Sequence, residues 1–504
     1  MEFSIFSWVF PPCCTTVLIG LAVVVLVLVL GLMKRIKGSN KPPGPFPLPF
    51  LGNILSMDFN NLPLSLSKLR KRYGNIFSLQ LFHENVVVLN GYDTIKEGLV
   101  LKSEDTADRP PFPVIDHLGF NKGLAFARYG QQWKELRRFA VFTLKNFGMG
   151  KKTIEERVRE EARYLCEAFQ NKQGHPFDPF LLLHNAVSNV MCSIVVGERF
   201  EYSNLKLQRM IYLFREMFTL ETGLIPQMFS LMPWLMRIPG PHQKVFKVQK
   251  VFLDFLQSII NKHMDTWDPG DCRDFIDAFI GEIKKANGNP KSSFNEITLL
   301  FTTANLFVGG SETTSITLRW AILMMLLNPH IQDKVHEEIN QVIGHDRTPT
   351  MKDQINMPYT NAVIHETQRY GDIFPMSLFH MAYRDTKLQG FNIPKGTTII
   401  ANLTSVLKDE TKWEKPHKFY PEHFLDGKGH FVQPEAFIPF SAGKRVCAGE
   451  PLARMELFIF FTTLLQHFDF QIPGDQATPC ADPVFAFTHS PLPFQICAME
   501  NYYE

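Results

Sequence analysis

The stretch that decides the fold is Phe440-Ser-Ala-Gly-Lys-Arg-Val-Cys-Ala-Gly449. It follows a proline-containing segment and is read as a loop, and the apolar spacing from Leu452 to Phe461 behind it predicts a buried helix. Free N–H groups at the start of that helix, with Arg445 two residues away, would stabilise a thiolate at Cys447. A buried structural cysteine is the alternative for Cys447 taken alone. The glycines and the arginine at these intervals favour a functional cysteine.

Composition describes an ordinary globular protein with a large core. The chain has 504 residues, of which 45% are apolar and 20% charged, and a formal net charge of +2. This charge, without a basic stripe, argues against a nucleic-acid binder. The eight cysteines are scattered and form neither a disulfide framework nor a paired C-x-x-C metal motif, which favours a reducing compartment.

The pattern Phe440-x-x-Gly443-x-Arg445-x-Cys447-x-Gly449 resembles the haem-binding loop of the cytochrome P-450 superfamily, the haem-thiolate monooxygenases. The resemblance implies a mainly α fold with small β-sheets (α+β), in which haem b lies between a long kinked central helix and the helix after the cysteine loop. It implies Cys447 as axial ligand of the haem iron. Further runs look like family two, subfamily D: Asp105–Pro111, Met357–Thr360, Gly371–Ile373, Pro421–Asp426 and Leu452–Leu457.

The N-terminal segment predicts a membrane anchor. Val17 to Met33 is almost purely aliphatic and long enough to span a bilayer. A cleaved signal peptide is the alternative, but Glu2 precedes the run and Lys34, Arg35 and Lys37 follow it. The positive-inside bias then places the rest of the chain in the cytosol, with the anchor in the endoplasmic reticulum.

Three regions are therefore expected: an anchor over residues 1–33, a basic and proline-rich hinge over 34–49 and a catalytic domain over 50–504. The hinge prolines favour a stiff connector, although a motif for a proline-binding domain has the same composition. Asn402-Leu-Thr404 is a formal glycosylation sequon that this topology keeps in the cytosol.

A long helix is predicted between Ser293-x-x-Glu296, read as a capping box, and Leu327-Asn328-Pro329. The paired Gly309-Gly310 in its middle needs a reason, such as a kink, a ligand against the backbone or a close helix crossing. The resemblance makes this the oxygen-activating helix. It implies that Thr313 donates a hydrogen bond during oxygen cleavage and that Glu312 relays protons.

Trp133 and Arg137 lie one turn apart on a predicted helix, where a cation–π pair would explain the spacing without any cofactor. The family resemblance instead implies that this pair holds a haem propionate. It implies further propionate partners at three positions: Arg109, His380 and Arg445.

The i,i+3 pair of Glu366 and Arg369 is too common to signal anything alone. By resemblance it is the family's Glu-x-x-Arg element, on which the segment containing His423 docks. Many members have arginine at the position of His423. The implied role is a structural charge network.

By resemblance, the substrate pocket is lined by Phe120, Glu221, Asn305, Phe374, Phe485 and Phe487. Such an aromatic lining suits apolar or aromatic molecules. Subfamily D is associated with lipophilic bases held by two acidic residues. Glu221 matches the first acidic position, but Asn305 occupies the second and cannot supply a negative charge. The segment from Phe214 to Trp234 fits plain core, a roof over the pocket or a membrane contact.

Because the chain has neither a P-loop nor G-x-G-x-x-G, NADPH is expected to act indirectly, with O2 as co-substrate. The resemblance implies electrons from NADPH–cytochrome P-450 reductase, with cytochrome b5 as a second partner. Two rival functions are a haem-thiolate isomerase or dehydratase acting on lipid peroxides, and a haem-binding sensor. Several basic residues could form a docking face for the redox partner, or they could simply be a solvated surface. They are Arg138, Lys145, Lys151, Lys152 and Lys444.

Overall fold

The computed structural model describes residues 40–59, 61–146, 153–220, 229, 233–240, 243–474, 476–485 and 488–501. The expected anchor over residues 1–33 and the first part of the hinge lie outside this range, as do Lys151, Lys152, Glu221 and Phe487. Within the described ranges, no helix combines the length and the apolar character that crossing a bilayer requires.

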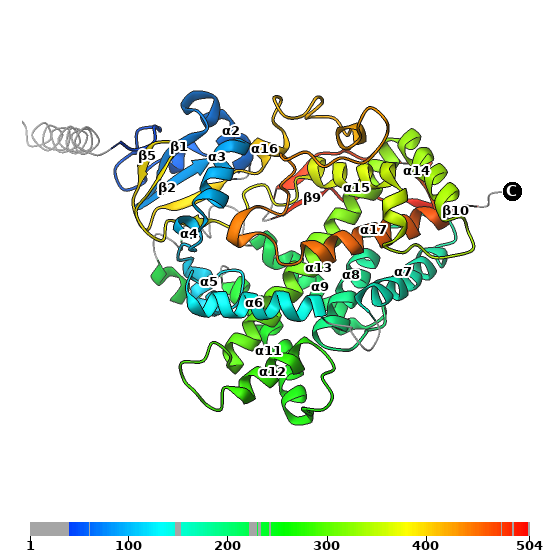
Figure 1. Cartoon of the computed structure of the whole chain (residues 1–504), viewed down its shortest axis with the longest axis horizontal. Coiled ribbons are helices and arrows are strands. Elements are labelled where there is room, and N and C mark those ends of the chain that lie inside the picture. Colours follow the sequence, from blue (N-terminus) through cyan, green and yellow to red (C-terminus); the bar gives the residue numbers. More distant parts are fainter. Residues whose placement is uncertain are drawn as a thin grey trace, which may run out of the picture.

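One helix, α13 (Glu296–Leu327), runs through the middle of the molecule (Figure 1). Its 32 residues extend about 48 Å at 1.5 Å per residue. It ends before Asn328 and Pro329, as predicted. Its N-terminus differs from the prediction, because Asn295 rather than Ser293 caps it: Asn295 accepts a hydrogen bond from the Thr298 N–H at 3.0 Å.

The paired glycines leave α13 continuous, and each has its own neighbour. A Cβ on Gly310 would lie 2.4 Å from the sulfur of Met191 on α8 (Phe180–Val195), so this glycine permits a close helix crossing. A Cβ on Gly309 would meet no described atom within 4 Å, because Gly309 borders a cavity. Gly310 therefore allows the close helix crossing, and Gly309 leaves the cavity wall open.

Helix α17 (Glu450–His467) follows the cysteine loop and packs against α13, as the apolar spacing predicted. In the loop, a short 3-10 turn spans Gly443–Arg445. Gly443 has φ of 75° and a Cβ there would lie 1.6 Å from the carbonyl oxygen of Leu99. Only glycine satisfies both the left-handed conformation and this contact.

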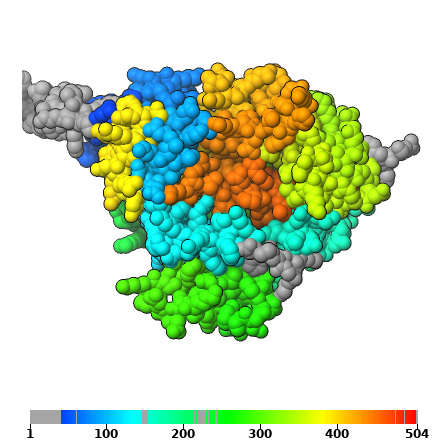
Figure 2. Space-filling view, viewed as in Figure 1, coloured from blue at the N-terminus to red at the C-terminus, as the bar shows by residue number. Residues whose placement is uncertain are grey.

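A four-stranded sheet lies at one end of the molecule, in the order β1-β2-β6-β3. A hairpin forms between β1 (Ile76–Leu81) and β2 (Glu84–Leu89), and β2 pairs in parallel with β6 (Thr398–Ala401). The sheet therefore joins segments about 300 residues apart, which lie side by side as the blue and yellow regions of Figure 2. Strand β3 (His380–Met381) completes the sheet and fixes the position of His380.

The remaining elements surround α13. Longer helices are α2 (Leu62–Tyr73), α6 (Gln131–Asn146), α7 (Ile154–Gln170), α9 (Leu205–Leu220), α11 (Lys244–Thr266), α12 (Phe275–Lys285), α14 (Pro329–Val342) and α15 (Pro358–Gly371). Short helices are α3 (Tyr92–Lys96), α4 (Ser103–Thr106), α5 (Pro113–Leu118) and α16 (Thr404–Leu407). Two-stranded sheets pair β4 (Thr386–Leu388) with β5 (Phe391–Ile393), β7 (Phe468–Gln471) with β10 (Cys497–Glu500), and β8 (Pro483–Phe485) with β9 (His489–Pro491).

Candidate haem and substrate site

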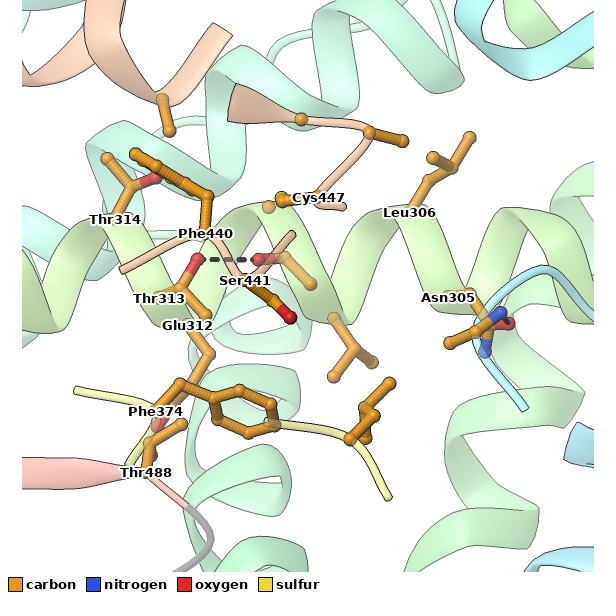
Figure 3. Close-up of a pocket in the computed structure, with 18 of the residues that line it drawn as sticks. Asn305, Leu306, Glu312, Thr313, Thr314, Phe374, Phe440, Ser441, Cys447 and Thr488 are labelled. Atoms are coloured by element: carbon orange, nitrogen blue, oxygen red, sulfur yellow. Dashed lines mark hydrogen bonds between the residues drawn. The ribbon is translucent and has the colours of Figure 1, made fainter. Parts of the chain in front are cut away.

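A cavity of about 370 Å³ lies between α13 and the cysteine loop. Side chains from α13, from the cysteine loop and from the segment that carries Phe374 gather around it (Figure 3). Cys447 borders this cavity, and its thiol has accessible surface there although protein surrounds its other sides. The cavity therefore lies between the long helix and the cysteine loop, where the resemblance implies haem.

The thiol of Cys447 sits at the N-terminus of α17. Burial raises its pKa, while backbone N–H groups of Gly449 and Glu450 and the charge of Arg137 act in the opposite direction. The thiol is therefore protonated in the bare protein, and a bound metal cation would displace the proton because coordinating thiols are deprotonated. The loop places the thiol by a hydrogen bond from the Cys447 N–H to the Phe440 carbonyl oxygen at 3.0 Å.

Three guanidinium groups, those of Arg109, Arg137 and Arg445, converge beside the cysteine loop. Burial, followed by the charge of Arg109, lowers the pKa of Arg445 to about 8, and Asp108 only partly offsets this. Burial, followed by the charge of Arg137, lowers the pKa of Arg109 to about 9. The region therefore carries excess positive charge, which favours an anionic ligand.

Part of this cluster's hydrogen-bonding capacity is unused. Arg445 donates to the carbonyl oxygens of Ala107 and Ala127 at 2.8 and 2.7 Å, but its buried Nη1 has no partner among the described residues. His380 donates from Nδ1 to the Thr106 carbonyl oxygen at 3.0 Å, and its buried Nε2 likewise meets no partner in the described part of the chain. Both unpaired nitrogens lie beside the guanidinium cluster, where they are available to an anionic ligand.

The structure shows the cation–π pair that the spacing of Trp133 and Arg137 indicated. The guanidinium of Arg137 lies 5.6 Å from the centre of the Trp133 ring and also donates to the Val446 carbonyl oxygen. Arg445 lies over the same ring at 4.0 Å. The indole N–H of Trp133 donates to the Leu124 carbonyl oxygen at 3.1 Å, so in this structure Trp133 acts as a stacking surface for the two cations.

These features fit haem b. A cationic cluster with unused N–H and imidazole groups suits the two propionates, and the thiol at a helix start suits the iron. The residues that would hold the group are Cys447, Arg109, Arg137, Arg445 and His380, with Trp133 supporting the arginines.

On the α13 side of the cavity, Thr313 is half-buried and donates its hydroxyl hydrogen to the Gly309 carbonyl oxygen at 2.7 Å (Figure 3). The lone pairs of the hydroxyl oxygen are thereby left to accept a hydrogen bond. Glu312 also borders the cavity, and its Oε2 lies 3.1 Å from Nε2 of His184. Sequence analysis missed His184, because it lies 128 residues from Glu312 and no local pattern marks it.

Of the residues expected to contact substrate, Phe120, Asn305 and Phe374 line the cavity. Asn305 accepts a hydrogen bond from the Ala125 N–H at 2.9 Å, which fixes its amide oxygen. Phe485 is 38% exposed on β8, contacts His489 and is not among the cavity-lining residues in the described ranges. Glu221 and Phe487 lie outside the described residues.

In the expected charge network, the polar side-chain atoms of Arg369 and His423 all have hydrogen-bond partners. Arg369 makes five hydrogen bonds: two to Glu366 and one each to the carbonyl oxygens of Leu407, Pro416 and Lys418. His423 contacts Glu366 through Nδ1 at 3.2 Å and accepts from the Lys415 N–H through Nε2 at 3.1 Å. One neutral tautomer of His423 satisfies both contacts.

Two other sequence features have clear positions. Arg138 and Lys145 are exposed on α6, whereas Lys444 is paired with Glu104 at 2.9 Å. Asn402 is fully buried and donates to Asn90 at 2.9 Å, so the folded chain has no room for a glycan at this sequon.

Comparison with known proteins agrees with this geometry. Residues 42–498 match the family model described as Cytochrome P450. The chain is 52% identical to cytochrome P450 2D6 of Homo sapiens over 490 residues, which cover 96% of this chain and 99% of that protein. It is 51% identical to cytochrome P450 2D3 of Rattus norvegicus over 484 residues, covering 95% and 97%. It is also 51% identical to cytochrome P450 2D15 of Canis lupus familiaris over 485 residues, again covering 95% and 97%.

The match spans the cavity, the cysteine loop and both charge clusters. These relationships define a haem-thiolate monooxygenase that holds haem b and uses O2. The chain belongs to the cytochrome P450 family, within subfamily D of family two.

Proposed function

We propose that the enzyme oxidises lipophilic small molecules, such as xenobiotics, amines, fatty acids or steroids, with electrons passed from NADPH by a reductase. The observation that supports this most directly is the cavity, which is bounded by the Cys447 thiol and by Glu312 and Thr313 of α13. The similarity to cytochrome P450 proteins supports the reaction class, and the cavity has room for an apolar molecule.

The chain's own residues divide the work. When bound, a thiolate-ligated haem activates dioxygen and carries the oxidation itself. Cys447 supplies the ligand, while Arg445 and His380 hold the acidic edge of the cofactor and fix its orientation. Thr313 presents its hydroxyl group to the cavity. The hydroxyl hydrogen is bonded to the Gly309 carbonyl oxygen, so the donor role that the resemblance implied requires this contact to break. Glu312, which is paired with His184, relays protons into the cavity beside Thr313. The apolar lining keeps bulk water away from these groups.

The setting of the enzyme follows from the sequence features outside the described residues. The aliphatic run before Lys34 supports a single anchor in the endoplasmic reticulum membrane, with residues 50–504 in the cytosol and residues 34–49 as the hinge. Arg138 and Lys145 support a docking face for NADPH–cytochrome P-450 reductase and for cytochrome b5.

The carbon monoxide difference spectrum of the reduced, detergent-solubilised protein tests ligation by Cys447. The red-shifted Soret band of thiolate-ligated haem is expected in the wild type and should be lost in Cys447→Ser. An unshifted band in fresh wild-type protein would contradict the assignment. Reductase-dependent NADPH consumption then separates a monooxygenase from a peroxide isomerase and from a sensor, neither of which needs outside electrons.

For substrate choice, we infer that lipophilic amines bind with weak selection for their charge. The Ala125 N–H occupies the amide oxygen of Asn305, so the amide offers N–H donors and no negative charge to the cavity. In Asn305→Asp the Ala125 contact is retained and a charge is added. The preference for a basic amine over its neutral isostere should rise by roughly tenfold, since charge-assisted hydrogen bonds are about twice as strong as neutral ones. An unchanged ratio of kcat/KM would rule this inference out.

A further inference from the structure

A buried histidine–carboxylate pair joins α8 to α13 directly behind the cavity. Nε2 of His184 lies 3.1 Å from Oε2 of Glu312, and the two side chains are only 2% and 7% exposed. Glu312 borders the cavity next to Thr313, whereas His184 is not among the cavity-lining residues of the described chain. The histidine therefore reaches the cavity only through the carboxyl group of Glu312.

The hydrogen-bond partners of His184 determine where its protons lie. Nδ1 is 3.1 Å from the Phe180 carbonyl oxygen, which can only accept, so Nδ1 carries a hydrogen. The other nitrogen faces a carboxyl oxygen. A bare nitrogen and a bare carboxylate oxygen would repel each other, so one further proton must lie between Nε2 and Oε2. The pair consequently holds a transferable proton at the edge of the cavity.

Two arginines lie over the ring of Phe180, which packs against the ring of His184. Arg319 of α13 is buried and lies over the Phe180 ring at 5.3 Å, and Arg215 of α9 lies over the same ring at 4.8 Å. Arg319 also lies 3.4 Å from Asp178, whose side chain is 39% exposed. Burial lowers the pKa of Arg319, and the charges of Asp178 and Glu312 oppose this.

Hydrogen bonds hold His184 between Glu312 and the N-terminal end of α8. Asp178 is at the surface and accepts a hydrogen bond from the Phe180 N–H at 2.8 Å. The Phe180 carbonyl oxygen contacts His184, and His184 contacts Glu312. A buried carboxyl group at the cavity cannot exchange protons with bulk water by itself. An imidazole can both give and take a proton, so His184 is a suitable group to return a proton to Glu312.

We propose that His184 supplies protons to the cavity through Glu312 during oxygen cleavage. Reduction of O2 by two electrons takes up two protons, releases one water and leaves one oxygen atom for the substrate. In each transfer the Nε2–H bond breaks and Glu312 Oε2 gains that hydrogen, while Glu312 gives a proton to the hydroxyl or water in the cavity. A water molecule that reaches Nε2 then returns a proton to the imidazole, since Nδ1 stays bonded to the Phe180 carbonyl oxygen. His184 is a positioning residue that acts through Glu312, and the proposal rests on the proposed role of Glu312.

A second pair in the same molecule provides a matched control. His263 of α11 donates from Nδ1 to the Ile259 carbonyl oxygen at 2.9 Å, and its Nε2 lies 2.7 Å from Asp274. The contacts copy those of His184, but neither His263 nor Asp274 lines the cavity in the described ranges. A purely structural loss should therefore be similar for His184→Gln and His263→Gln. A loss of proton supply should occur only in the first.

The experiment compares wild type, His184→Gln, Glu312→Gln, the double variant and His263→Gln as reductase-coupled holoenzymes, each checked by its carbon monoxide spectrum. We expect His184→Gln to lower product per NADPH by roughly tenfold or more, since acid–base groups contribute at least that much. Hydrogen peroxide should account for the lost product, and the solvent isotope effect should rise. The double variant should resemble Glu312→Gln, because both groups serve one route. His263→Gln should keep wild-type coupling.

A readout independent of turnover uses the resting holoenzyme. The infrared carboxyl band that disappears in Glu312→Gln should shift in His184→Gln and stay unchanged in His263→Gln. Wild-type coupling, isotope effect and carboxyl band in His184→Gln would overturn the proposal. If Glu312→Gln uncouples the enzyme but His184→Gln does not, only the role of His184 fails. If Glu312→Gln also keeps full coupling, the proposed role of Glu312 fails with it.

Discussion

The molecule contains two buried clusters of arginine and histidine, one around Arg369 and His423 and one around Arg445 and His380, and they differ in how completely their polar atoms are used. In the first, Arg369 makes five hydrogen bonds, and His423 uses both ring nitrogens. In the second, Arg445 and His380 each keep one buried nitrogen without a partner among the residues described. The first cluster is complete within the chain, whereas the second requires a ligand.

The charges follow the same division. Arg369 lies against the carboxylate of Glu366, and both side chains are fully buried. Arg445 has Arg109 and Arg137 as neighbours, and burial together with Arg109 lowers its pKa to about 8. Burying a cation without a matching anion is costly. The difference teaches that residue type does not separate a structural charge network from a binding site, whereas the pairing of each charge and N–H does.

The largest expected effect is on the stability of the first cluster, around Glu366 and Arg369. Glu366→Ala leaves Arg369 buried without its carboxylate, and breaking a buried pair in this way costs about 3–5 kcal/mol. We expect a large drop in the thermal midpoint of the holoenzyme, measured by loss of the thiolate-type carbon monoxide spectrum. Glu104→Ala removes the exposed partner of Lys444 and should change the midpoint little. Equal midpoints for the two variants would contradict a closed structural network.

The second prediction concerns haem binding by the second cluster, around Arg445 and His380. Arg445→Gln keeps hydrogen-bond donors near Ala107 and Ala127 but removes the charge that faces the cofactor. Hydrogen bonds to charged groups contribute about 1.5–3 kcal/mol, so haem should dissociate faster by roughly ten- to hundredfold. Transfer of haem to an excess of a haem-free acceptor protein measures this rate. The thermal midpoint should fall less than in Glu366→Ala. If Arg445→Gln lost stability without transferring haem faster, Arg445 would have a structural role and not a cofactor-binding one.

Sequence could predict those parts of the site that local chemistry determines. The loop around Cys447, the helix behind it and the C-terminal end of α13 follow from spacing, glycine and proline. The start of α13 was misassigned, because Ser293 and Asn295 are both good caps and Ser293 bonds to Glu135 instead. Two adjacent capping residues compete, and distant partners decide between them.

Other features depend on contacts across the fold and had no sequence signal. The pairing of His184 with Glu312 joins two helices, and the unused Nη1 of Arg445 depends on which carbonyl oxygens reach the other nitrogens. The family resemblance named Phe485 as a pocket residue, yet the structure places it at a partly exposed strand end. Spacing along the chain does not reveal such long-range arrangements.

The smallest expected effect is a pH dependence of stability that arises from His380 in the second cluster. Burial, followed by the charges of Arg109 and Arg445, lowers the pKa of His380 well below 6.5, so the folded chain holds this imidazole neutral. In the unfolded chain its pKa is about 6.5, and below that pH the unfolded state binds more protons. The free energy of unfolding should therefore fall as pH decreases, by up to about 1.4 kcal/mol per pH unit for this one group.

His380→Gln removes this contribution, so its stability should fall less steeply between pH 6.5 and pH 5 than that of the wild type, as urea titrations of the unloaded protein at each pH would show. The haem-loaded protein sharpens the comparison. A carboxylate at Nε2 of His380 favours a proton there and raises the pKa of the imidazole, so cofactor binding should flatten the wild-type slope toward that of the variant. If haem left the slope difference unchanged, His380 would belong with His423 among the structural histidines.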